Sequence, residues 1–225
     1  MAMRRRAELW RRDPRPGFFA LAFGVATVVF AGLTAAVLLH GPLVALDVRV
    51  SDWIRSWPSP ALETFFKLIT HLGDALSITI MTTVLVIALL ARKRPAQALL
   101  AAVTVGIGHL IGALLRALIQ WPRPPIDVAK VTQPTTFSFP SGHATATFLF
   151  FGVLFFVVAL EAKRNSTRAW TLAGCVLLAV LVGLSRIYLG MHWFGDVIGA
   201  WVLGAAWGTL CAAVYFALSP ADRPA

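Results

Sequence analysis

The sequence predicts an all-α integral membrane protein with six transmembrane helices, forming a single polytopic domain over residues 1–225. Three observations lead to this prediction: an apolar composition, repeated long runs without a charge, and basic residues concentrated in alternate connections. Hydrophobic residues make up 58% of the chain and charged residues only 13%. A soluble domain would carry roughly twice that share of charged residues.

Six apolar runs contain no Asp, Glu, Lys or Arg, and most are long enough to cross ~30 Å of hydrocarbon as a helix. They cover residues 18–39, 75–91, 96–115, 144–160, 170–184 and 197–218. The second and fifth runs are short and softly bounded. The first run exceeds the ~7–15-residue core of a signal peptide and no small-residue cleavage site follows it, so we expect an uncleaved helix.

Basic residues gather before the first run, after the last run, and in the second and fourth connections. Thirteen of the 20 lie there: Arg4, Arg5, Arg6, Arg11, Arg12, Arg15, Arg92, Lys93, Arg94, Lys163, Arg164, Arg168 and Arg223. With six spans, all of these positions face the same side of the membrane, which is the positive-inside pattern. We therefore expect both termini in the cytoplasm, with residues 1–17 as a basic cytoplasmic head. The net charge of +10 then reflects topology, and we expect no nucleic-acid partner.

The connection over residues 41–74 is predicted to be an outer, interfacial segment. It divides at Pro58-Ser59-Pro60, where Ser59 can cap a second short helix and Pro60 suits its first position. Apolar residues then recur at helical spacing, while Glu63 and Lys67 can pair at i, i+4 on the opposite side. An amphipathic helix lying on the bilayer is the favoured interpretation. The alternative is a helix that shapes an entrance for a lipid.

The two cysteines, Cys175 and Cys211, both fall inside apolar runs. We expect them to be small buried hydrophobic residues rather than a disulfide or metal ligands. No Cys/His spacing in the chain resembles a metal site, and no cofactor is predicted.

Three arginines on the predicted outer side accompany two histidines. Arg116 and Arg186 lie at the outer ends of the third and fifth runs, and Arg123 lies in a proline-rich stretch that cannot continue a helix. Ser141 is a candidate N-cap for the fourth run, and Gly142 would let a ligand approach the backbone. The free N–H groups of a helix start form an anion site, for which phosphate is the usual ligand, and arginine forks suit phosphate oxygens.

His192 and Asp196 are spaced at i, i+4, six and ten residues after Arg186. On a helix these positions share a face, so the carboxylate can accept the imidazole N–H and fix the tautomer. A histidine held in this way can act as a nucleophile or a base. Beside three arginines and a helix start, the pair indicates phosphoryl transfer.

These residues resemble the three-part signature of the type 2 phosphatidic acid phosphatase superfamily, which includes membrane lipid phosphatases and vanadium haloperoxidases. The matching parts are Arg116-x6-Arg123-Pro124, Pro140-Ser141-Gly142-His143 and Ser185-Arg186-x5-His192-x3-Asp196. The resemblance covers roughly residues 75–218, the expected catalytic core, and it implies a phosphatase helix bundle in a chain of six spans. One position departs, because the family usually has lysine where Arg116 stands.

The resemblance implies a role for each matching residue. His192 is expected to attack phosphorus and form a phosphohistidine, with Asp196 orienting it. His143 is expected to protonate the leaving oxygen and then to activate water. The phosphoryl oxygens are expected to be held by Arg116, Arg123, Ser141, Gly142 and Arg186.

The predicted function is hydrolysis of a lipid phosphate within the bilayer, at the outer face of a bacterial inner membrane and without a metal. The lipid is expected to be of the undecaprenyl diphosphate, phosphatidylglycerophosphate or phosphatidic acid type. Two alternatives stay open: a phosphotransferase that passes the phosphoryl group to a second acceptor, and a non-enzymatic lipid transporter on the same fold. The apolar runs exclude a soluble haloperoxidase, and the sequence does not define an oligomeric state.

Overall fold

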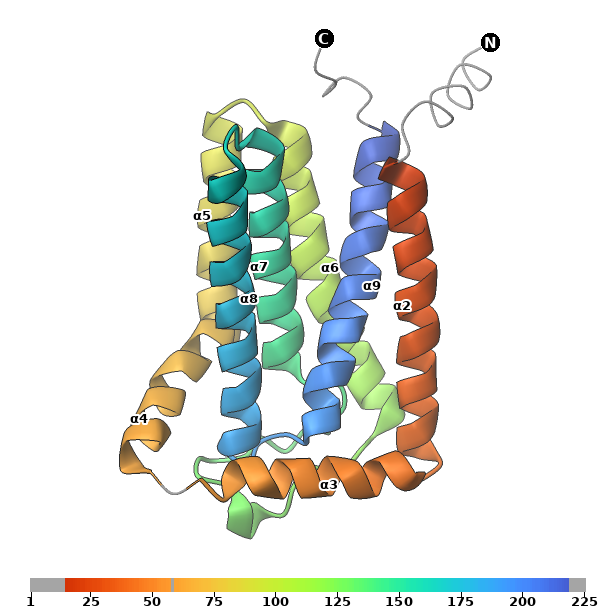
Figure 1. The fold of residues 1–225 in the computed structure, drawn as a ribbon, viewed down its shortest axis with the longest axis vertical. Coiled ribbons are helices and arrows are strands. Elements are labelled where there is room, and N and C mark those ends of the chain that lie inside the picture. Colours follow the sequence, from red (N-terminus) through yellow and green to blue (C-terminus); the bar gives the residue numbers. More distant parts are fainter. Residues whose placement is uncertain (1–14, 58, 219–225) are drawn as a thin grey trace.

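A computed structural model describes residues 15–57 and 59–218, and these described residues are helical with no strand. Six long helices match the six predicted runs (Figure 1): α2 (Arg15–Leu38), α5 (Ala75–Ala91), α6 (Pro95–Ile119), α7 (Gly142–Glu161), α8 (Asn165–Tyr188) and α9 (Phe194–Leu218). The predicted all-α membrane fold is confirmed. The fifth run, which the sequence left short, belongs to a helix of 24 residues because polar Asn165–Arg168 and Ser185–Arg186 extend it at both ends.

Five of the long helices in the described chain are apolar and long enough to cross a membrane on their own. The exception is α5, which has 17 residues. It meets that criterion together with the preceding α4 (Pro60–Ile69) and the 3₁₀ turn η1 (Thr70–Gly73), although the chain bends by 52° between them. This bend falls at Asp74, the single residue between η1 and α5.

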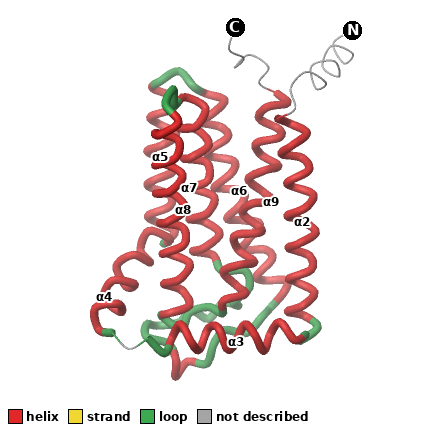
Figure 2. Tube along the Cα trace, in the orientation of Figure 1, coloured by secondary structure: helices red, strands yellow, loops and turns green. Residues whose placement is uncertain are grey.

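The central helix of the bundle is α7, which packs against α5, α6, α8 and α9, while α2 packs along α9. Leu149, Phe150 and Val153 of α7 are buried in the main apolar core. A second apolar cluster joins α3 (Pro42–Arg55), α4, α8 and α9 around Phe66 and Tyr188. Figure 2 shows that the loops are concentrated at the two ends of the bundle.

Two of the helix connections at one end of the bundle carry clusters of basic residues. The α5–α6 and α7–α8 connections, with Arg92, Lys93, Arg94, Lys163 and Arg164, lie at the end where α2 starts and α9 finishes (Figure 1). The opposite end, called here the α3 end, carries α3, α4 and the α6–α7 and α8–α9 connections. The predicted head up to residue 14, and Arg223, lie outside the described residues.

The interfacial segment forms two helices that divide where the sequence predicted. Ser59 caps α4 by accepting from the Leu62 N–H at 3.2 Å, and Lys67 pairs with Glu63 at 2.7 Å. Part of the apolar surface of α4 packs against protein, since Phe66 is buried with its ring 5.0 Å from that of Tyr188, while Phe65 and Leu68 remain exposed. The segment therefore supports the α3 end, and η1 carries it directly to the candidate site.

Candidate active site

All eight sequence-predicted site residues lie at the α3 end of the bundle, drawn from the ends of four helices and two connections. The chain leaves α6 at Gln120, in the left-handed conformation, and enters a proline-rich loop. A second turn after α8 depends on Gly190, whose φ is +70°. A side chain there would also collide with the Val128 carbonyl, since a Cβ would lie 2.4 Å from its oxygen. This turn carries His192 back over the start of α9.

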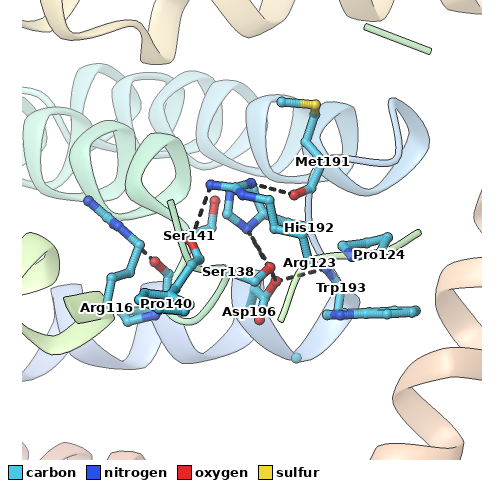
Figure 3. Close-up of polar contacts among 12 residues, drawn as sticks. Arg116, Arg123, Pro124, Ser138, Pro140, Ser141, Met191, His192, Trp193 and Asp196 are labelled. Atoms are coloured by element: carbon cyan, nitrogen blue, oxygen red, sulfur yellow. Dashed lines mark hydrogen bonds and ion pairs between the residues drawn. The ribbon is translucent and has the colours of Figure 1, made fainter. Parts of the chain in front are cut away.

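The His192–Asp196 pair forms as predicted, with Nδ1 of the imidazole 3.1 Å from Oδ2 of the carboxylate (Figure 3). The helical basis of that prediction was wrong, because α9 begins at Phe194 and His192 precedes it. Asp196 instead reaches back over the helix start and also accepts from the Trp193 N–H at 2.8 Å. The hydroxyl of Ser138 donates to the same oxygen, Oδ2. With Nδ1 facing the carboxylate, Nε2 is the nitrogen left for chemistry.

Burial keeps His192 neutral. Its side chain is almost completely enclosed, and burial lowers its pKa well below the usual 6.5, with the charges of Arg186 and Arg123 opposing protonation further. A neutral imidazole has a lone pair on Nε2. Its partner carboxylate is ready to stabilise the positive charge that the ring would gain on attacking an electrophile.

Arg123 ties the proline-rich loop to the His192 turn. Its guanidinium donates to the Thr136 carbonyl at 2.7 Å, the Met191 carbonyl at 2.6 Å and the Phe137 carbonyl at 3.2 Å. Nη1 also lies 3.3 Å from Nε2 of His192. Arg123 was predicted only as a phosphate ligand, and the structure adds this positioning role. The N–H facing Nε2 is the one that can turn to a phosphoryl oxygen once that nitrogen engages phosphorus.

The other two arginines reach the same region from α6 and α8. Arg116 donates to the Pro140 carbonyl at 3.0 Å. Arg186 is 5% exposed and donates to the hydroxyl of Thr70 at 2.8 Å, while its Nε has no partner among the described residues. A buried guanidinium N–H without an acceptor is costly, and a phosphoryl oxygen would satisfy it.

Ser141 occupies the N-cap position of α7 as predicted, but its hydroxyl makes no capping bond. The hydroxyl is buried without a partner in the described chain, so it is free to donate to a ligand. Gly142 has a different neighbour from the one expected: a Cβ there would lie 2.9 Å from Nη1 of Arg116. The missing side chain therefore leaves room for the Arg116 guanidinium against the helix start.

His143, in the first turn of α7, is held by a residue that the sequence analysis missed. Its Nε2 lies 2.9 Å from Oδ1 of Asp74, and Oδ2 of Asp74 lies 2.7 Å from Nδ1 of His71. Ser138, Thr70 and Asp74 all contact the predicted residues and were not singled out. Ser138 stands three residues before Ser141, close enough to have been noticed. Asp74 had a weaker signal, a carboxylate directly before an apolar run.

Phosphoryl transfer is the chemistry that these groups can perform, and the surrounding fold makes the protein an integral membrane enzyme of that class. Comparison with known sequences gives the family. The chain belongs to the PAP2 superfamily, whose family model matches residues 97–220. This confirms the resemblance drawn from the three motifs.

Two relatives and one solved structure are similar along most of the chain. Phosphatidylglycerophosphatase B of Bacillus subtilis is 27% identical over 183 residues, which are 80% of this chain and 88% of the relative. Decaprenylphosphoryl-5-phosphoribose phosphatase of Mycobacterium tuberculosis is 32% identical over 154 residues, 67% of this chain and 79% of the relative. The crystal structure of a transmembrane PAP2 type phosphatidylglycerolphosphate phosphatase from Bacillus subtilis superposes with a TM-score of 0.73 at 27% identity, covering 88% of this chain and 94% of that one. The chain is a membrane lipid phosphatase of this superfamily.

Proposed function

We propose that this protein hydrolyses the phosphomonoester of a phosphatidylglycerophosphate-type lipid through a phosphohistidine intermediate, at the outer face of the membrane. The observation that carries the proposal is the buried His192–Asp196 pair, with Nδ1 of His192 held 3.1 Å from the carboxylate and Nε2 facing the guanidinium of Arg123. The names of the Bacillus relative and of the similar solved structure support the choice of lipid.

In the first step, the lone pair on Nε2 of His192 attacks phosphorus as the bond from phosphorus to the lipid oxygen breaks. His143 supplies a proton to that oxygen, which leaves as an alcohol. The imidazole of His192 becomes positively charged in the phosphoenzyme, and Asp196 stabilises this charge through Nδ1–H. The carboxylate is already in place, so this stabilisation needs no rearrangement.

In the second step, water attacks the phosphoryl group and gives its proton to His143. The bond between Nε2 and phosphorus breaks, His192 returns to its neutral form, and inorganic phosphate leaves. In both transition states charge collects on the equatorial oxygens. The donors that face them are Nε of Arg186, the Ser141 hydroxyl, the Arg116 guanidinium and the start of α7, which are fixed before the reaction begins.

The test is phosphate release by the purified protein from phosphatidylglycerophosphate, phosphatidic acid, undecaprenyl phosphate and undecaprenyl diphosphate, each in the same detergent. We expect the phosphatidylglycerophosphate substrate to have the highest kcat/KM, and His192→Ala to release nothing from any of them. A matched control is His40→Ala, because the His40 ring packs at a tilt against Trp121, with centroids 5.3 Å apart, and is not part of the site. A higher kcat/KM on undecaprenyl diphosphate would overturn the choice of lipid.

The same assay separates the two alternative functions. A phosphotransferase would release little free phosphate and would yield a newly phosphorylated lipid or sugar, which chromatography of the products would detect. A transporter would leave every substrate intact, and His192→Ala would not change its behaviour.

A further inference from the structure

A fourth segment completes the site, and it lies outside the stretch matched by the family model. This segment is η1 with the following residue, residues 70–74, whereas the family match starts at residue 97. Thr70 accepts a hydrogen bond from Arg186, and Asp74 is bonded to His143. Gly73 lies directly against the imidazole, because a Cβ at that position would be 2.9 Å from both Cβ and Cδ2 of His143.

Asp74 is placed where an aspartate ordinarily caps a helix. It is the N-cap residue of α5, with the extended backbone typical of that position (φ −64°, ψ 146°). An N-cap aspartate usually accepts from backbone N–H groups of the first turn, which stabilises the helix. Here the side chain makes no such bond. Both carboxylate oxygens are turned instead to imidazoles, Oδ1 to His143 and Oδ2 to His71.

We propose that Asp74 is a positioning residue for the acid–base chemistry of His143. The proposal rests on the function proposed above. Asp74 accepts the Nε2–H of His143, so Nδ1 is the nitrogen that exchanges protons with substrate and water. Nδ1–H passes its proton to the lipid oxygen as the phosphorus–oxygen bond breaks, and Nδ1 takes a proton back from the attacking water. The Nε2 proton stays on the imidazole throughout.

The charges around His143 explain why a carboxylate is needed there. Three groups face His143: Arg116 from α6, Arg186 from α8 and His192 from the α8–α9 turn. The positive charges of the two arginines disfavour a positive charge on His143. Asp74 is the carboxylate that faces His143 in the described chain, with His71 on its far side. A protonated His143 is therefore stabilised by one anion against several cations. Both Asp74 and His71 are partly open to solvent, with side chains 42% and 68% exposed.

The decisive variant is Asp74→Asn, because asparagine is as good an N-cap as aspartate but carries no charge. A comparison of alkyl and aryl phosphates as substrates should separate two possible roles of Asp74, positioning His143 and capping α5. We expect Asp74→Asn to reduce kcat on an alkyl phosphate by about tenfold to a hundredfold, a part of the roughly 10²–10⁴ that general acid catalysis contributes. 4-Nitrophenyl phosphate, whose leaving group needs no proton, should lose less than threefold in its phosphorylating step. KM should change little for either substrate.

The pH profile gives a second readout. Loss of the carboxylate removes the stabilisation of protonated His143, so the falling alkaline limb of kcat should move to lower pH in Asp74→Asn. His71→Gln removes the other imidazole that contacts Asp74, while the bond between Asp74 and His143 is kept. It is the matched control, and its leaving-group dependence should stay that of the wild type.

Two results would overturn the inference. One is equal loss of activity on alkyl and aryl phosphates in Asp74→Asn with an unshifted pH profile. The other is full activity of Asp74→Asn on both substrates combined with a uniform loss in Asp74→Ala, which would reduce Asp74 to a helix cap. If the wild type releases no phosphate from lipids, the proposed function fails, while the soluble phosphate series still tests Asp74.

A measurement that needs no turnover completes the test. In ¹⁵N-histidine spectra recorded at a pH where His143 is neutral, and assigned with His143→Gln, the wild type should show a single tautomer protonated at Nε2. Asp74→Ala should show exchange between both tautomers. Identical His143 signals in the two proteins would contradict the proposal even if the enzyme were inactive on every substrate tried.

Discussion

Asp47 on α3 accepts a hydrogen bond from the backbone N–H of Gly195 on α9 at 2.6 Å. One turn along α3, Ser51 accepts from the N–H of Phe194 at 2.9 Å. The first N–H groups of a helix have no partner within it, so α3 caps α9 from outside. Since Asp196 lies in the same turn of α9, the interfacial helix helps to position the carboxylate that holds His192.

Replacing Asp47 should therefore affect both stability and catalysis. We expect Asp47→Ala to lower the free energy of unfolding by about 1–2 kcal/mol, as for a lost helix cap, and to reduce kcat. Thermal unfolding in detergent and phosphate release would measure the two effects. Asp52→Ala on the same helix is the control, because Asp52 is 62% exposed and its ion pair is with Arg55 of the same helix. Equal losses in the two variants would show that the cap is unimportant.

The pH dependence of His192 follows from its lowered pKa. A histidine with the ordinary value near 6.5 would be about nine-tenths protonated at pH 5.5, whereas His192 should remain neutral there. Because the unfolded chain gains this proton near pH 6.5 and the folded protein does not, stability should fall as the pH drops below 6.5. The unfolding temperature of His192→Gln should depend less steeply on pH between 6.5 and 5.0 than that of the wild type. Parallel curves would contradict the lowered pKa.

The contact between Gly142 and Arg116 predicts non-additive substitutions. Gly142→Ala should displace the guanidinium and cost about tenfold in kcat, a fraction of what one oxyanion donor contributes. The ammonium group of lysine is smaller than a guanidinium and would not meet the new methyl group. Gly142→Ala should therefore reduce kcat much less in an Arg116→Lys background. A double-mutant cycle on kcat measures this coupling. If the two losses simply multiply, the glycine serves the approach of the ligand, as the sequence first suggested.

The donor set predicts how metal removal affects activity. In the described part of the chain, no group of three His, Cys, Asp or Glu residues could hold a metal ion together. Activity should persist in excess EDTA, and vanadate should inhibit it by occupying the cationic site as a five-coordinate phosphoryl mimic. Loss of activity on chelation with recovery on adding magnesium would defeat the mechanism.

The distribution of basic residues predicts the orientation in the membrane. Lys130 lies in the α6–α7 connection at the α3 end and Lys93 in the α5–α6 connection at the other. In intact cells, Lys130→Cys should react with an impermeant thiol reagent and Lys93→Cys should not. The two native cysteines are buried and serve as the unreactive background. The reverse labelling pattern would place the site on the cytoplasmic face.

Much of this fold could be predicted from the sequence, because a membrane restricts which segments can cross it. A helix that crosses hydrocarbon needs a long uncharged run, so the spans were found to within a few residues where the runs were long. Arg116, Arg123 and Arg186 were conspicuous because charges at the ends of such runs need a reason. Their gathering with His143 and His192 at one end followed from the number of spans between them.

Contacts made across long stretches of chain could not be predicted. Asp74 is 69 positions from His143, and Asp47 is 148 from Gly195. Rules based on neighbouring residues would have assigned Asp74 to capping α5. They do not reveal that both carboxylate oxygens bond to imidazoles instead. The lack of a capping bond from Ser141 could not be predicted for the same reason. Whether its hydroxyl bonds to the helix depends on the residues that surround the start of α7.

The order of the segments matters to anyone who would engineer this enzyme. His192, Asp196 and the three arginines all fall within residues 97–220, so this portion would look sufficient for transplantation into another scaffold. The graft would leave behind Asp47 under the first turn of α9 and Asp74 against His143. We expect a functional module of this protein to begin upstream of α3, so that both helices of the 41–74 segment are carried over with the core.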